Sequence, residues 1–223
     1  MSFKLDHRSF IYTPYYCEEN IWQLCKGIFT STLCNKDNDI SYYVVFITNN
    51  LKQVPIWTMT CAKNNDIVIW DYHVILVNLV LYYQSDNSSK VYDFDTTLEF
   101  GCNLEEYFQK ALKNENNFPD KYKRKYRIIP GKVYLDHFAS DRSHMKDGLG
   151  NFLKPPPSYS PIFTTTSANN LFRYLDVSPS SNNSERSLPE NDFESLRDSS
   201  IEAPIYGKVL DHQEFLRFCH VTE

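Results

Sequence analysis

Hydrophobic and polar residues follow one another along the chain in a pattern typical of a helix followed by several strands. The segment NIWQLCKGI (20–28) places its apolar residues at the spacing of one helical face, and Cys17 extends that face by one turn. Gly27 is the expected end of this helix. The pattern therefore predicts Cys17 at the N-terminal end of the first helix, on its inward side.

Runs of β-branched and aromatic residues predict strands in the middle of the chain. The predicted strands are SYYVVFIT (41–48), VPIWTM (54–59), IVIWDYHVILVNL (67–79), KVYDFDT (90–96) and YRIIP (126–130). Further helices are predicted at NLEEYFQKAL (103–112), VYLDHFAS (133–140) and within 207–220, where Asp211 and Glu214 form a capping signature. This order predicts an α+β fold in which an antiparallel sheet packs against the first helix.

A change of composition divides the chain. KPPPSYSP (154–161) fits neither a helix nor a central strand, and residues 164–203 are rich in Ser, Asn, Asp and Pro. We therefore predict a main domain over residues 1–163 and a loop or insertion over 164–203, disordered over 177–203. Residues 204–223 are predicted to return as a helix that packs on the main domain.

The net charge of −5 argues against general attraction to nucleic acid or to anionic lipid. The basic run KYKRKYR (121–127) is interpreted as a solvated surface strand or loop. The most apolar stretch (67–83) carries Asp71, His73 and Asn78 and is read as buried strand, not a membrane span. With no apolar signal sequence in MSFKLDHRSF, we expect a soluble intracellular protein without nucleic-acid or membrane partners.

The six cysteines show no CxxC pair and no regular spacing. Together with the expected intracellular location, this argues for reduced and mostly buried thiols rather than a disulfide framework. It also argues against a zinc site, because ligand pairs at short spacing are missing.

A cysteine at a helix N-terminus has a chemical advantage, because the helix dipole and free N–H groups stabilise a thiolate and a neighbouring oxyanion. Glu18 and Glu19 in the same turn oppose a second negative charge. A reactive Cys17 would therefore need a cationic partner such as an imidazolium. The alternative is that Cys17 is a buried packing residue.

His73 is the one histidine of six that lies inside a strongly apolar strand. It is either a satisfied core residue or a catalyst. On the next predicted strand Asp93 and Asp95 share one face, and a carboxylate there can orient His73 in a Cys–His–Asp arrangement.

The expected hairpin between these two strands does not bring the residues together directly. The turn-like residues 86–89 would place Asp93 opposite Leu81. Contact between Asp93 and His73 would therefore need an asymmetric loop or a bulge before Lys90.

Six motifs, in order, are similar to those of one enzyme family: YCEENIW (16–22), VPIW (54–57), VIWDYHV (68–74), YDFDT (92–96), FASDRSHMKD (138–147) and PPPSY (155–159). Together they resemble the protein N-terminal glutamine amidohydrolase family, from Tyr15 to Tyr159 and again at the last helix. The resemblance implies a catalytic triad of Cys17, His73 and Asp93 on a papain- or transglutaminase-like core. It implies neither a metal nor an organic cofactor.

The same resemblance implies deamidation of an N-terminal glutamine of proteins or peptides to glutamate, which feeds an N-degron pathway. It places the protein in the cytosol, with the nucleus as a second compartment, and a monomer is expected. A papain- or transglutaminase-like enzyme of other specificity and a non-catalytic module that binds N-terminal residues are the alternatives.

Recognition of a chain terminus requires a carboxylate or several carbonyl groups to bind the free α-ammonium. Glu19, Asp71 and Asp141 are the candidate carboxylates, and Ser143 is a further candidate contact. Each has a structural alternative, such as pairing of Asp141 with its neighbour Arg142 to brace the loop. Trp70 and Tyr72 are expected on the strand face opposite His73, in the core rather than in the pocket.

Overall fold

The computed structural model describes residues 5–30, 40–64, 66–80, 89–178 and 205–220. Its main strands are β1 (Ile40–Thr48), β4 (Tyr72–Val80), β5 (Lys90–Tyr92), β6 (Cys102–Asn103), β7 (Lys125–Pro130) and β8 (Lys208–Leu210). They form a six-stranded sheet in the order β6-β5-β4-β1-β7-β8, and each neighbouring pair is antiparallel. β2 (Val54–Ile56) and β3 (Val68–Trp70) pair in a second, two-stranded sheet.

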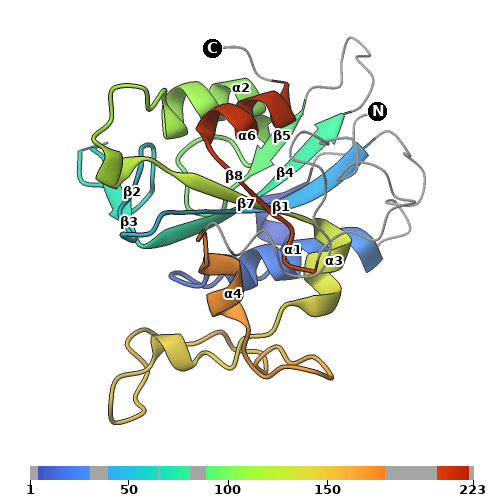
Figure 1. The fold of residues 1–223 in the computed structure, drawn as a ribbon. Helices are drawn as coiled ribbons and strands as arrows, with labels where there is room; N and C mark the ends of the chain where they lie inside the picture. Colours follow the sequence, from blue (N-terminus) through green and yellow to red (C-terminus); the bar gives the residue numbers. More distant parts are fainter. Residues whose placement is uncertain (1–4, 31–39, 65, 81–88, 179–204, 221–223) are drawn as a thin grey trace.

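Helices cover both faces of the main sheet (Figure 1). On one face lie α1 (Cys17–Thr30), α3 (Gly131–His137) and α4 (Leu171–Leu175). On the other lie α2 (Leu104–Tyr107), which continues as the π-helical turn η2 (Phe108–Leu112), and α6 (His212–Cys219). Single 3₁₀ turns occur at η1 (His7–Ser9), η3 (Asp120–Tyr122) and η4 (Ser143–Met145). None of the helices among these residues is long and apolar enough to cross a membrane.

Alternation along the strands explains the two cores. In β1, Val45 and Ile47 pack under α2 and α6, whereas Val44 and Phe46 pack against α1, α3 and α4. Successive side chains of a strand point to opposite faces, so a strand buried on both sides carries a continuous apolar run. The α+β class, the antiparallel sheet and the packing of α1 against it are therefore confirmed.

Capping residues in the sequence correctly predicted where two of the helices begin. Asn103 caps α2 by accepting the N–H of Glu105, and Asp211 and Glu214 form a complete capping box at α6. The prediction that Gly27 ends the first helix is wrong, since α1 continues to Thr30. Gly27 lies against the ring of Phe10, where an added Cβ would come within 2.6 Å of a ring carbon.

The predicted strand over 67–79 is in fact two strands in two different sheets. β3 pairs with β2 and β4 pairs with β1, and the chain bends at Asp71 between them. The Asp71 carboxylate accepts the N–H of Tyr72, and its carbonyl accepts the Thr48 hydroxyl. These local bonds stabilise the bend that separates His73 from the preceding apolar residues.

The predicted strand over 90–96 ends at Tyr92, and its register with β4 is regular. Leu76 pairs with Tyr92 and Asn78 pairs with Lys90, so the pairing centres on residue 84 and needs no bulge. The register that would place Asp93 opposite Leu81 is wrong for that reason. Residues 81–88 themselves lie outside the described residues.

The basic run is solvated only in part, since Lys121, Lys123 and Lys125 are exposed but its two arginines are not. Arg124 and Arg127 are each 1% exposed. Arg124 pairs with Glu115 at 2.8 Å and donates to backbone carbonyls. Arg127 donates to the carbonyls of Tyr174, Asp176 and Tyr206. Burial lowers the pKa of Arg127 to about 10.

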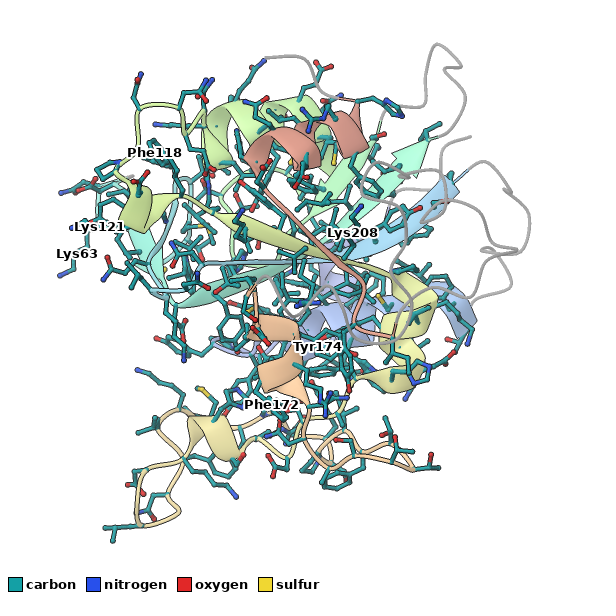
Figure 2. All side chains as sticks on the ribbon, in the orientation of Figure 1. Lys63, Phe118, Lys121, Phe172, Tyr174 and Lys208 are labelled. Carbon is teal, nitrogen blue, oxygen red and sulfur yellow. The ribbon has the colours of Figure 1, made fainter. Side chains whose placement is uncertain are left out.

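The segment expected as a loop or insertion over 164–203 is described as far as residue 178, and 179–203 lies outside the described residues. Its described part includes α4. Tyr174 on this helix is fully buried and Phe172 is 65% exposed; both are labelled in Figure 2. After the gap, α6 places Phe215 and Phe218 in the core.

Candidate active site

Cys17 is the first residue of α1 and is 7% exposed. Asn20, one turn later, exchanges two hydrogen bonds of 2.9 Å with the backbone of Thr13, which fixes the chain as it enters the helix. Cys17 packs in the same apolar core as Val74 of β4. These contacts place Cys17 in the core that contains the strand residue following His73.

His73 belongs to a buried chain of hydrogen bonds. Its Nε2 lies 2.9 Å from Oδ1 of Asp93, and both side chains are fully buried. The other carboxylate oxygen of Asp93 accepts the hydroxyl of Tyr107 at 2.7 Å, and Oδ1 also accepts the N–H of Asp95. The Nδ1 atom of His73 has no hydrogen-bond partner among the described residues, so it is available for proton transfer.

Charge interactions dominate the ionisation of this pair. Burial alone would lower the pKa of His73, but Asp93, followed by Asp95 and Glu18, outweighs it and the pKa is raised. Burial alone would raise the pKa of Asp93, but His73 and the hydrogen bonds from Asp95 and Tyr107 keep it lowered. The carboxylate of Asp93 therefore stabilises the imidazolium that forms when His73 takes up a proton.

The surroundings of Cys17 favour a neutral thiol. Burial raises its pKa well above the usual value, and the charges of Glu18, Asp95 and Asp71 raise it further, against the N–H of Val74. The thiol donates to Oε2 of Glu18 at 3.6 Å. Cys17 can therefore ionise only if a base takes its proton or if the negative charge around it is reduced.

Glu18 is a site residue that the sequence did not single out. It is completely buried, and its Oε2 accepts both the Cys17 thiol and the Tyr72 hydroxyl, the latter at 3.0 Å. Its Oε1 has no hydrogen-bond partner in the described part of the chain, although Nε2 of His144 lies 3.3 Å away. Sequence alone could not tell which of two consecutive glutamates faces the sulfur.

Trp70 was expected on the strand face opposite His73, and this expectation is wrong. Tyr72 does lie in the core on the face opposite His73, together with Val74 and Leu76. The Trp70 ring lies 5.1 Å from the His73 ring between centroids, and the Trp70 indole N–H is buried with no partner among the described residues. Tyr72 bonds Glu18 beside Cys17. The bend at Asp71 changes the strict alternation from which the expectation followed.

The four candidate substrate contacts have different surroundings. Glu19 is fully buried and its carboxylate is bound by the Arg142 guanidinium, at 2.8 Å for the shortest contact. Asp71 is exposed at the β3–β4 bend. Asp141 and Ser143 both accept the side-chain amide of Asn169, so they brace the loop that carries η4.

His73, Asp93 and Asp95 form the one group of described residues with the spacing of metal ligands, their ligand atoms lying within 4.8 Å of one another. The atoms already have other partners. His73 and Asp93 bind each other, and Asp95 accepts the Tyr12 hydroxyl at 2.6 Å. The group is accounted for as a hydrogen-bond network between side chains.

A family model described as N-terminal glutamine amidase matches residues 12–219. The chain belongs to this family. The match includes Cys17, His73 and Asp93 as well as Glu18, so every residue of the site described above lies within the region that defines the family.

Curated relatives share the name protein N-terminal glutamine amidohydrolase. A zebrafish (Danio rerio) protein N-terminal glutamine amidohydrolase is 43% identical over 169 residues, covering 76% of this chain and 80% of the relative. The human protein of that name is 40% identical over 173 residues, covering 76% and 79%. The Arabidopsis thaliana protein is 38% identical over 182 residues, covering 78% of each chain.

Proposed function

We propose that this protein hydrolyses the side-chain amide of an N-terminal glutamine, giving N-terminal glutamate and ammonia. Membership in the family and the names of its curated relatives support this reaction. The observation that carries the proposal is the position of Cys17 at the start of α1, against the strand that holds the buried His73–Asp93 pair. Such an arrangement suits an activated thiol.

In the proposed mechanism the Cys17 proton passes to Nδ1 of His73 as sulfur bonds to the carboxamide carbon. Free N–H groups of the first turn of α1 and the unpaired indole N–H of Trp70 are the donors available to the oxyanion. His73 then protonates the departing nitrogen, the C–N bond breaks, and ammonia leaves a thioester on Cys17.

Water completes the cycle. His73 removes a proton from the water as its oxygen bonds to the thioester carbon, and the C–S bond breaks. The products are N-terminal glutamate and the regenerated thiol, so the net reaction consumes one water and releases one ammonia. Asp93 orients His73 through Nε2 throughout.

The wider setting is part of the proposal. The protein works as a monomer with a papain- or transglutaminase-like core, in which residues 1–163 form the catalytic domain and 204–223 pack back onto it. It acts in the cytosol and the nucleus without a metal or organic cofactor, and its product enters an N-degron pathway.

Ammonia release from three peptides tests the function: one beginning with Gln, one with Asn, and one with Gln only at an internal position. We expect release from the first peptide alone, and its loss in Cys17→Ser. Cleavage of a peptide bond would instead indicate a protease, and incorporation of an added amine would indicate a transglutaminase. Binding without any ammonia would indicate a non-catalytic module.

A further inference from the structure

A buried carboxylate with a free oxygen lies directly beside the proposed nucleophile. Glu18 has no solvent exposure, and Oε1 lacks a hydrogen-bond partner among the described residues. An unpaired buried acceptor is costly, because its desolvation is not compensated. Such an oxygen can accept a hydrogen bond from a donor group of a bound ligand.

A group close to this oxygen is also unsatisfied. Nε2 of His144 lies 3.3 Å from Oε1 of Glu18, but neither ring nitrogen of His144 has a hydrogen bond to another described residue. The His144 side chain is 23% exposed, whereas that of Glu18 is completely buried. His144 is therefore the partly exposed side chain that an incoming cation would displace from Glu18.

The charge around the sulfur suits a cationic substrate group. Glu18, Asp95 and Asp71 each act on Cys17 with a negative charge. The buried guanidinium of Arg142 does not offset these charges, because it is already paired with Glu19. A positive group on the substrate would complement this excess of negative charge.

The distances fit an N-terminal glutamine. Four covalent bonds separate its α-nitrogen from its carboxamide carbon, so the two atoms lie at most about 5 Å apart. Oε2 of Glu18 lies 3.6 Å from the Cys17 sulfur, and Oε1 is on the same carboxylate. An amine bound at Oε1 therefore leaves the carboxamide within reach of the sulfur.

We infer that the Glu18 carboxylate binds the α-ammonium of the substrate, and that this pairing neutralises the charge that holds the proton on Cys17. The inference rests on the proposed function and adds to it the residue that recognises a free chain terminus. Recognition and activation are then linked, since a chain without a free amine leaves the thiol protonated.

Two peptides that differ only in the α-amine test the inference. One begins with Gln, and the other begins with 4-carbamoylbutanoyl, which is Gln without its α-amine. We expect the wild-type protein to prefer the first in kcat/KM by at least about 100-fold, as for loss of one partner of a buried charge pair. In Glu18→Gln the preference falls below about 10-fold, because the ammonium group loses its charged partner.

Asp71→Asn and Asp141→Asn are the matched controls, because each removes another acid that was a candidate for the same role. Both should retain the wild-type preference between the two peptides. The inference would be overturned if either control lost the preference for the peptide with the α-amine while Glu18→Gln kept it. If Glu18→Gln is inactive on both peptides, Glu18→Asp decides: a restored preference supports the inference and an absent one refutes it.

The pH dependence of Cys17 alkylation by iodoacetamide, followed by peptide mass spectrometry, tests the link to the thiol. Other charged or titratable groups around Cys17 and Glu18 are His73, Tyr72, Asp71, Asp95, Tyr134 and His144. All of them remain in Glu18→Gln, so we expect the Cys17 pKa to fall in this variant. An unchanged alkylation profile would refute the link.

The two proposals fail in different ways. If the wild-type protein releases no ammonia from either peptide, the proposed function is wrong and the inference falls with it. If it releases ammonia equally from both peptides, the amide chemistry stands and the role of Glu18 is refuted.

Discussion

Tyr107 provides a quantitative test of the buried network behind His73. Its hydroxyl donates to Oδ2 of Asp93 at 2.7 Å, and the side chain is fully buried. Tyr107→Phe removes the hydroxyl but retains the ring, so packing is almost unchanged. A hydrogen bond to a charged group contributes about 1.5–3 kcal/mol, so we expect a loss of about 2 kcal/mol of unfolding free energy at pH 7.

The same change has a defined pH dependence. The pKa of Asp93 is lowered in the folded protein because His73 and the bonds from Asp95 and Tyr107 outweigh burial. The stability contributed by such a group is present above its unfolded pKa, about 3.9, and is lost as pH falls through the folded pKa. The deficit of Tyr107→Phe should therefore be complete at pH 7 and should shrink below about pH 4.

Urea unfolding at several pH values, followed by tryptophan fluorescence, measures this difference. For a chain of this size the loss corresponds to a decrease in Tm of roughly 4–8 °C. Tyr174→Phe is the control, because Tyr174 is equally buried but its hydroxyl has no hydrogen-bond partner among the described residues. If the two variants are equally stable at pH 7, the reasoning about Asp93 is wrong.

Four further substitutions, one of them a control, test other parts of the structure. Trp70→Phe retains a ring but removes the indole N–H, so steady-state assays should show kcat lower by about 100-fold; an unchanged kcat would exclude Trp70 as an oxyanion donor. Glu19→Gln breaks the buried pair with Arg142 and should cost about 3–5 kcal/mol in urea unfolding. Glu106→Gln, which removes an exposed pair, should cost less than about 1 kcal/mol, and equal losses would contradict the role of burial. Gly207→Ala should cost more than about 1 kcal/mol, because φ is +64° and a Cβ would lie 1.9 Å from a carbonyl oxygen; wild-type thermal stability would refute this.

Features that depend on local sequence could be predicted. The start of α1 at Cys17, the cap of α6 at Asp211 and the strand pattern of β1 follow from the spacing of residues close together in the chain. The family motifs extended this prediction to His73 and Asp93, whose side chains the fold brings to 2.9 Å.

Features that depend on tertiary contacts could not be predicted. Arg124 and Arg127 are charged, yet carbonyls and an acid from distant segments allow both to be buried. The first turn of α1 presents Glu18 to the sulfur and Glu19 to Arg142, a division set by neighbouring elements. Nothing in the sequence near Tyr107 shows that its hydroxyl reaches Asp93.

The guanidinium of Arg127 has a consequence for how the chain can vary in length. It binds the carbonyls of Tyr174 and Asp176 before residues 179–204 and that of Tyr206 after them, so both ends of that stretch are held by one side chain. A connection anchored in this way can lengthen at little cost, because doubling a loop adds only about 0.6 kcal/mol of closure entropy. We therefore expect a longer or shorter sequence between the two anchored ends to leave the sheet and Cys17 in place.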